Sequence, residues 1–159
     1  MTCHRLQTEI TLDAPLEEVF RFHAEAKNLE TITPPWMRLR VLHPVEMGEG
    51  AVIDYRLRVR GVPLRWRSEV TTWDPPNRFV DEQRRGPFRL WIHEHDFAAS
   101  DGRTRSRDRV TYAAPGGELA NRLFLEADLR RIFRYRHAVL TELFGRVGRE
   151  PKIEVAEVP

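Results

Sequence analysis

Two histidines two residues apart, His93 and His95, are the residues of this chain whose type and spacing best suit chemistry. They lie in RLWIHEHDF (89–97), whose alternating character indicates a β-strand. Side chains alternate across a strand, so both imidazoles share one face with Trp91 and Phe97. The opposite face carries two acidic residues in its second half, Glu94 and Asp96, and should be exposed to water. The histidines should therefore face the protein interior. Imidazoles buried there need polar partners or a polar cavity.

The neighbouring strands supply acidic partners. A tight turn joins the histidine strand to the strand before it and places Asp81 opposite Trp91 or His93. A second turn joins it to the strand after it and brings Asp108 close to His93 or His95. A β-bulge would shift either register by one residue.

Four roles fit this cluster. The first is a buried hydrogen-bond network in which four polar residues satisfy the histidines: Asp81, Gln83, Asp108 and Arg136. The second is the polar wall of a pocket that orients a mostly apolar ligand. The third is acid–base catalysis, in which His93 or His95 is poised by a neighbouring aspartate. The fourth is a metal site on both histidines and a carboxylate, but no third ligand is clearly marked and the aspartates make a metal unnecessary, so we expect none.

The composition is that of an ordinary globular protein with one domain. The 159 residues are 41% hydrophobic and 31% charged, which suffices for one sizeable core. The formal net charge of +2 creates no strong field toward nucleic acid or membrane. Four alternating arginines from Arg103 to Arg109 lie on an outer face, where acidic neighbours can pair with them, and they lack interleaved aromatics. We therefore expect no nucleic-acid partner and no membrane insertion.

Motifs for covalent or cofactor chemistry are absent from the sequence. Cys3 is the only cysteine, which excludes an internal disulfide and a cysteine-based zinc site. There is no Gly-x-Ser-x-Gly motif, phosphate-cradling glycine loop or dinucleotide fingerprint, so we expect no cofactor. The first residues form no apolar signal segment and no run approaches transmembrane length, which makes the cytoplasm the expected location.

Strand patterns separated by short turns occupy most of the chain. The first expected strand covers residues 4–12, and two short helices follow, one after Asp13-Ala14-Pro15 and one within 27–36. The apolar, irregular segment 27–36 is suited to the mouth of a pocket or is a simple connector, and Trp36 itself is expected in the core, like most tryptophans. Six more strands are expected, joined by turns typical of an antiparallel meander, at 38–42, 51–60, 64–73, 78–84, 89–97 and 104–112.

A long helix is expected near the end of the chain. Residues 118–147 lack proline and carry apolar residues at helical spacing, which predicts a helix of roughly 28 residues. Arg136 lies within its apolar stripe and should project toward the histidines. We assign residues 1–148 to one domain and expect 149–159 to be a poorly ordered tail. The predicted fold is α+β: a curved antiparallel sheet of about seven strands wraps the long helix, and two short helices after the first strand close one end.

The apolar side of each strand should face a space between sheet and helix. Trp73 has the opposite parity from Trp66 and is expected on the outer surface, where it would form an apolar patch with Val80, Leu90 and Ile92 that favours a homodimer. The candidate ligand-binding residues are Tyr55, Trp66, Phe79, Asp81, Trp91, His93, His95, Phe97 and Arg136.

Five segments carry a family resemblance: ITPPW (32–36), GVPLRW (61–66), FVDEQRRGPFRLWIHEHDF (79–97), DRVTY (108–112) and IFRYR (132–136). They resemble one group of the SRPBCC superfamily, which includes START lipid-transfer domains, plant pathogenesis-related allergens and polyketide cyclases. The resemblance covers roughly residues 4–146, and its most specific part is the Trp-x-His-x-His-x-Phe block. It implies the helix-grip fold, with a hydrophobic cavity for a lipid-like or polycyclic ligand.

The pocket becomes the leading interpretation, and two alternatives stay open. The leading hypothesis is binding of a hydrophobic small molecule between the sheet and the long helix. The first alternative is a cyclase- or dehydratase-like enzyme in which His93 or His95 moves a proton with help from Asp81 or Asp108. The second is a protein-interaction module that uses the outer sheet or the long helix. Membership of the superfamily does not choose among them, because binders and enzymes share the scaffold.

Overall fold

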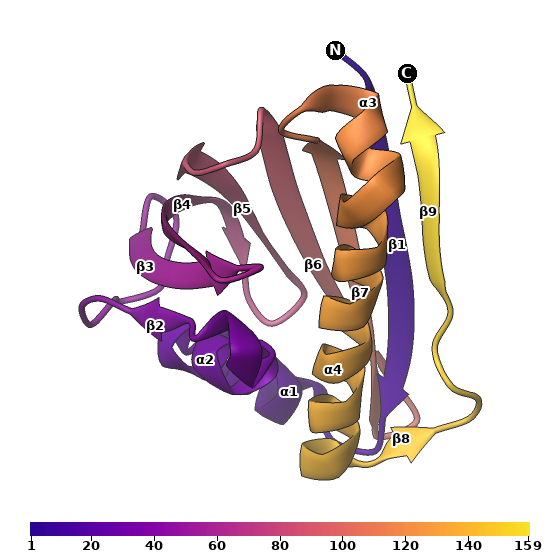
Figure 1. The fold of residues 1–159 in the computed structure, drawn as a ribbon. Helices are drawn as coiled ribbons and strands as arrows, with labels where there is room; N and C mark the ends of the chain where they lie inside the picture. Colours follow the sequence, from indigo (N-terminus) through magenta and orange to yellow (C-terminus); the bar gives the residue numbers. More distant parts are fainter.

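A curved antiparallel sheet wraps one side of a long helix in the computed structural model, which describes residues 1–159 (Figure 1). The strands are β1 (Cys3–Leu12), β2 (Arg40–Val41), β3 (Val52–Val59), β4 (Val62–Asp74), β5 (Arg78–Arg85), β6 (Leu90–Ser100), β7 (Arg103–Ala113), β8 (Arg146–Val147) and β9 (Ile153–Val158). The helical segments are α1 (Leu16–His23), η1 (Ala26–Asn28), α2 (Leu29–Ile32), η2 (Pro35–Met37), α3 (Gly117–Ala120), η3 (Asn121–Leu125) and α4 (Glu126–Phe144). The predicted α+β helix-grip fold is confirmed.

The sheet contains nine strands, two more than expected. Their order is β2-β3-β4-β5-β6-β7-β1-β8, and β9 also pairs with β1. The seven expected strands are all present, and consecutive strands from β2 to β7 are neighbours, as the short turns predict. The turn between β3 and β4 places Arg60 and Gly61 at φ 50° and 81°, the left-handed pair typical of two-residue hairpin turns.

The long helix contains one irregular segment. It begins as α3, passes through the π-helical segment η3, continues as α4 and ends at Phe144, where Gly145 has φ 78°. At the start of η3 the buried Asn121 accepts a hydrogen bond from the Tyr112 hydroxyl at 3.1 Å. The expected long helix is present, but it ends at Phe144 and not at residue 147, because residues 146–147 form β8 beside β1.

The expectation of a poorly ordered tail at 149–159 is wrong. Residues Ile153–Val158 form β9, whose register against β1 runs from Cys3 opposite Val158 to Thr8 opposite Ile153. The segment IEVAEV has a strand alternation, and Ile153 and Val155 pack against buried residues of the core. Its pairing covers backbone groups of β1 that would otherwise form an exposed sheet edge.

The outer position expected for Trp73 is also wrong. The register between β4 and β5 shifts between Val70 and Thr72, and this irregularity reverses which face the following residues occupy. The Trp73 ring consequently packs inward, 5.4 Å from Phe20 and 5.7 Å from Phe79. The predicted outer patch therefore lacks its tryptophan.

Short helices close one end of the space between sheet and helix. Figure 1 shows α1 and α2 together beside the lower half of α4, below β3 and β4. Val19 and Phe20 of α1 are buried and share a core cluster with Phe97 of β6 and Leu140 of α4. Such packing fixes the helices against both layers and leaves the upper part of the space open. No helix has the length and apolar character that crossing a membrane would require.

Candidate functional site

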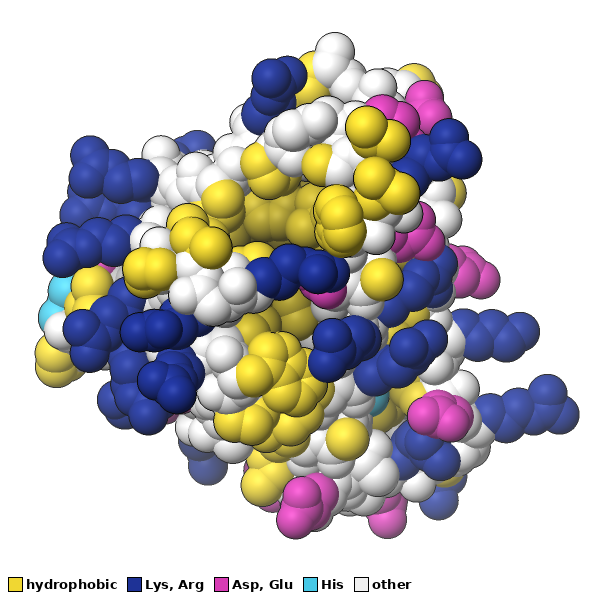
Figure 2. Space-filling view, viewed as in Figure 1, with side chains coloured by type: hydrophobic (Ala, Val, Ile, Leu, Met, Phe, Trp, Pro, Cys, Tyr) yellow, Lys and Arg dark blue, Asp and Glu magenta, His cyan; other side chains and the backbone are white.

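A cavity of about 410 Å³ lies between the sheet, α4 and the short helices. Hydrophobic residues make up 21 of the 36 that line it, so its surface is mostly apolar. Figure 2 shows an apolar hollow in the centre of this face, with dark blue basic side chains at its border. The volume falls within the range of small-molecule sites.

Aromatic rings form one wall of the cavity. Tyr55 stacks on Trp66 with ring centroids 5.8 Å apart and an interplanar angle of 17°. Trp91 meets Trp66 edge-on at 5.3 Å, and Phe88 lies 4.6 Å from Trp91. The Trp66 indole N–H donates to Ser68 Oγ at 3.0 Å, which satisfies the one polar atom of that side chain. The wall therefore offers a rigid apolar surface.

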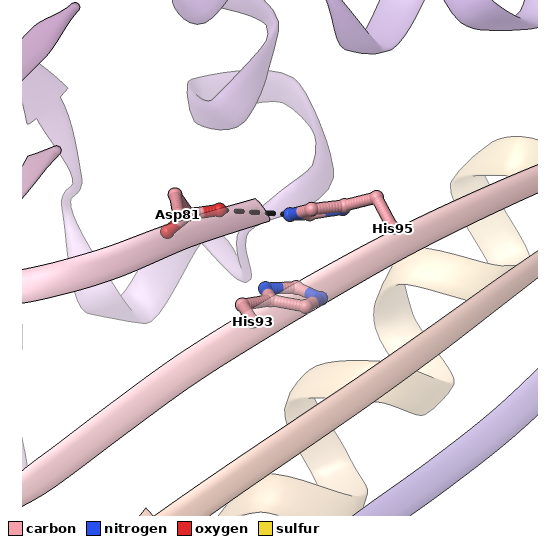
Figure 3. A group of neighbouring side chains, drawn as sticks. All are labelled: Asp81, His93 and His95. Atoms are coloured by element: carbon pink, nitrogen blue, oxygen red, sulfur yellow. Dashed lines mark hydrogen bonds and ion pairs between the residues drawn. The ribbon is translucent and has the colours of Figure 1, made fainter. Parts of the chain in front are cut away.

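Four polar residues line the base of the cavity, Asp81, His93, His95 and Arg136, and Asp108 lies behind them. We call these five residues the polar floor. In the sheet, Asp81 lies opposite His93 and Asp108 lies opposite His95. The hydrogen bonds follow the diagonals instead. His93 Nε2 lies 2.8 Å from Asp108 Oδ1. His95 Nε2 lies 2.8 Å from Asp81 Oδ2, and Figure 3 shows this contact. Asp108 thus binds His93, as the strand pairing allowed, and Asp81 lies opposite His93 as predicted but binds His95 instead.

Asp108 is the centre of the polar floor. Its Oδ1 contacts His93 Nε2, His95 Nδ1 at 3.5 Å and Arg136 Nη2 at 3.1 Å. Burial alone would raise the pKa of Asp108, but the charge of Arg136 and the hydrogen bonds with both histidines outweigh it and hold the pKa well below its usual range. Asp108 is therefore a fixed anion that stands behind the imidazoles and does not line the cavity.

The two histidines favour different protonation states. Burial and the charge of His95 lower the pKa of His93 to about 4, so this ring is neutral near pH 7. Burial also opposes the charged form of His95, but its hydrogen bonds with Asp108 and Asp81 prevail and raise its pKa. With His95 cationic, the polar floor balances Arg136 and His95 against two carboxylates.

One nitrogen of the polar floor is left for a ligand. Because His93 donates its Nε2–H to Asp108, its Nδ1 carries a lone pair, and that atom has no protein hydrogen-bond partner. His93 Nδ1 is not one of the side-chain atoms that are buried from solvent without a hydrogen-bond partner, and His93 lines the cavity. Nδ1 can therefore accept a hydrogen bond or a proton from a molecule in the cavity.

A metal ion fits the same residues less well. Ligand atoms of Asp81, His93 and His95 lie within 4.8 Å of one another, which is close enough to consider a shared ion. The His93 and His95 rings, however, stack 3.7 Å apart at an interplanar angle of 28°. Nearly parallel rings direct their in-plane lone pairs side by side and not toward one point. His95 Nε2 is also already engaged by Asp81, so the geometry favours the hydrogen-bond network.

The predicted ligand-binding residues lie together with one exception. Eight of them line the cavity: Tyr55, Trp66, Phe79, Asp81, Trp91, His93, His95 and Arg136. Phe97 does not, and its expected place on the wall is wrong. Its ring packs 5.6 Å from Phe20 and 4.9 Å from His23, because α1 covers the part of β6 where Phe97 lies. Phe97 thus belongs to the core beneath the cavity.

We define the mouth of the cavity by Trp36, Arg60, Asp128 and Arg131. Segment 27–36, which ends at Trp36, was expected at a pocket mouth or as a connector, whereas the other three residues were not among the expected site residues. Trp36 was expected in the core, but it is 53% exposed and lies beneath the Arg131 guanidinium at 5.1 Å from the ring centroid. Helical spacing gave a usable signal, because Asp128 lies two turns before Arg136 on the same face of α4.

One family model matches this chain, over residues 12–138, and its description is "Polyketide cyclase / dehydrase and lipid transport". No curated protein matches the chain. Among solved structures, the Zhui aromatase/cyclase from Streptomyces sp. R1128 superposes with a TM-score of 0.70 at 22% identity, covering 88% of this chain and 93% of that one. The residues that the family model matches include all five residues of the polar floor, on the strands and on α4.

Two other structures show how widely the fold occurs. Ginseng major latex-like protein 151 from Panax ginseng has a TM-score of 0.67 at 9% identity, over 89% of this chain and 97% of that one. The nucleoside-diphosphate sugar epimerase from Corynebacterium glutamicum matches with a TM-score of 0.64 at 22% identity, over 86% of this chain but 28% of that one. The chain belongs to the polyketide cyclase / dehydrase and lipid transport family of the SRPBCC superfamily.

Proposed function

We propose that this protein binds a hydrophobic small molecule, lipid-like or polycyclic, in the cavity between the sheet and α4. The observation that carries the proposal is the apolar cavity of about 410 Å³ with a polar floor at its base. Burial of ligand surface against the aromatic wall supplies the driving force. Membership of a family described by both cyclases and lipid transport supports a ligand in this place.

The polar floor would orient the ligand. His93 Nδ1 accepts a hydrogen bond, so it favours a ligand with a hydroxyl or another donor at its buried end. The Asp81 carboxylate also lines the cavity and adds a second acceptor beside it. Because both groups are already fixed by protein partners, little ordering is needed when the ligand enters.

A filled cavity tests the proposal. Ile132 of α4 lines the cavity, and Ile132→Trp would occupy much of the free volume. We expect the wild type to bind the neutral fluorescent dye N-phenylnaphthylamine with one-to-one stoichiometry, and the variant to lose that binding while it stays folded by circular dichroism. Ile92→Trp is the matched control, because Ile92 is partly exposed on β6 and does not line the cavity. Equal binding by the wild type and Ile132→Trp would refute the proposal.

A second candidate is a cyclase- or dehydratase-like reaction in the same cavity. It is favoured by the pairing of a neutral histidine, His93, with a histidine of raised pKa, His95, 3.7 Å apart. His93 Nδ1 would accept a proton from carbon or oxygen of the ligand. The Asp81 carboxylate, which lines the cavity, would take the Nε2 proton of His95 and pass it to a ligand carbonyl or departing hydroxyl. The aromatase/cyclase with the same fold is consistent with such chemistry.

Turnover separates the two candidates. A poly-β-carbonyl thioester incubated with the wild type would be cyclised or dehydrated by an enzyme, and liquid chromatography with mass spectrometry would detect the product. His95→Gln should abolish turnover while dye binding persists, since the substitution removes the proton but keeps a polar side chain. Dye binding by the wild type without any turnover of the thioester would remove the catalytic candidate.

A further inference from the structure

An ion pair bridges the mouth of the cavity. Arg60 lies in the turn between β3 and β4, and Asp128 lies on α4, on the other side of the opening. Arg60 Nε donates to one carboxylate oxygen of Asp128 and Arg60 Nη2 to the other, both at 2.9 Å. This fork-to-carboxylate geometry fits any carboxylate, including one on a ligand.

The pair is accessible to solvent and therefore exchangeable. The Arg60 side chain is 56% exposed and that of Asp128 is 20% exposed. Ion pairs at such positions contribute little to stability, because water and dissolved ions compete with them. The Arg60 guanidinium also lies 5.0 Å from the centroid of the exposed Phe124 ring, which holds the cation near the mouth when its carboxylate partner changes.

Charges along the cavity differ between its two ends. Arg58, Arg60 and Arg131 line the outer part of the cavity together with the acidic residues Glu25 and Asp128, which leaves an excess of one positive charge. The polar floor, by contrast, pairs its own cations with its own carboxylates. An anionic group on a ligand therefore finds its complement at the mouth, while the apolar body lies against the aromatic wall.

We propose that Arg60 binds the anionic head of an amphipathic ligand, and that Asp128 occupies the guanidinium when no ligand is bound. This inference rests on the proposed binding function and specifies its ligand class as an apolar body with a carboxylate or similar anion at the outer end. Binding exchanges one carboxylate for another at Arg60, so burial of the apolar body drives the exchange and the anion sets its orientation.

Two substitutions that break the same ion pair give opposite results under this proposal. Arg60→Gln removes the anion-binding group, so laurate should lose its advantage over uncharged lauryl alcohol in displacing N-phenylnaphthylamine. Asp128→Asn removes the competing carboxylate, so the affinity for laurate should rise about tenfold while that for the alcohol stays the same. If the pair were only structural, or only a barrier to entry, both substitutions would change laurate binding in the same direction.

A second ion pair supplies the matched control. Arg67 donates to both carboxylate oxygens of Asp54 at 2.7 and 3.0 Å, with side-chain exposures of 47% and 23%, and neither residue lines the cavity. Arg67→Gln should leave the displacement by laurate and by lauryl alcohol at wild-type values. A shift of the same sign in Arg60→Gln and Asp128→Asn, or equal effects of Arg60→Gln and Arg67→Gln, would overturn the inference alone. If the wild type binds the dye but laurate does not displace it, this inference fails and the proposed binding function stands. If the wild type does not bind the dye, the proposed function fails and this inference fails with it.

Discussion

The polar floor and the mouth of the cavity each contain an arginine paired with an aspartate, but the pair at the floor is buried and the pair at the mouth is exposed. At the floor, Arg136 and Asp108 lie 3.1 Å apart with side chains only 7% and 2% exposed. At the mouth, Arg60 and Asp128 lie 2.9 Å apart with 56% and 20% of their side chains exposed. Removing one partner leaves an uncompensated buried charge at the floor, whereas water replaces the lost partner at the mouth. Similar distances therefore give a fixed pair and an exchangeable pair.

The largest effect is expected from Asp108→Asn. The substitution leaves the buried Arg136 guanidinium without its carboxylate, and both imidazoles lose the anion that holds them. We expect the free energy of unfolding in urea to fall by about 3–5 kcal/mol. Asp128→Asn is the control at the mouth and should cost less than about 1 kcal/mol. Equal losses in the two variants would contradict the distinction between floor and mouth.

A smaller effect is expected when the partner charge is removed as well. Arg136→Met alone should destabilise the protein by an amount similar to Asp108→Asn, because it leaves the buried Asp108 carboxylate without its arginine. The double variant carries neither charge, so its loss should fall short of the sum of the two single losses by at least about 1 kcal/mol. Additive losses in the double-mutant cycle would show that the two residues do not act as a pair.

The histidines of the polar floor make stability depend on pH. The pKa of His93 is about 4 in the folded protein, below the ordinary 6.5, so the folded state binds fewer protons between these values. The free energy of unfolding should therefore fall as pH drops from 6.5 to 4. The raised pKa of His95 affects a higher pH range. Its contribution to the free energy of unfolding is fully present below pH 6.5 and is lost as pH rises through the pKa of His95 in the folded protein.

His93→Gln isolates this contribution. Urea unfolding at pH 7 and pH 5 should show a smaller loss of stability on acidification in the variant than in the wild type, because the buried titrating group is gone. The remaining loss belongs to other buried histidines with lowered pKa, His23 at about 3 and His137 at about 4. An unchanged difference between the two pH values would show that His93 is not kept neutral by burial.

The smallest effect on stability is expected from Arg60→Gln. The pair that it breaks is exposed, so the free energy of unfolding should change by less than about 1 kcal/mol. The same variant should nevertheless lose the preference for laurate over lauryl alcohol. A loss of stability as large as that of Asp108→Asn would mean that Arg60 supports the fold and not the ligand.

Most of the fold could be predicted because its signals are local. Alternation marks the strands, and short turns force sequential strands to be neighbours. Two features of the fold differ from the prediction. The alternation of Ile153–Val158 is the pattern of a strand, and the prediction of a tail there overlooks this pattern. The irregularity between Val70 and Thr72 could not be anticipated, because the face of Trp73 depends on pairing with β5 and not on its own neighbours.

In the candidate site, the polar floor could be predicted from local signals and most of the mouth could not. Strand register was enough to bring Asp81 and Asp108 to the histidines, because cross-strand neighbours follow from the turns. Helical spacing places Asp128 on the Arg136 face of α4, but no sequence pattern fixes how α4 lies relative to the turn that carries Arg60. Arg60 and Asp128 are 68 residues apart in the chain, and only the packed fold makes them neighbours. Phe97 was misplaced for the same reason, since the position of α1 decides what covers it.

Isotope-filtered NMR of carbon-13-labelled protein with unlabelled laurate would locate a ligand in the cavity. We expect nuclear Overhauser contacts from the hydrocarbon chain to Trp66, Trp91 and Phe79, and from the methylene beside the carboxylate to the mouth. Contacts confined to the outer face of the sheet, around Ile92, would show that the cavity is not the binding site, and so would an unperturbed cavity in the presence of bound laurate.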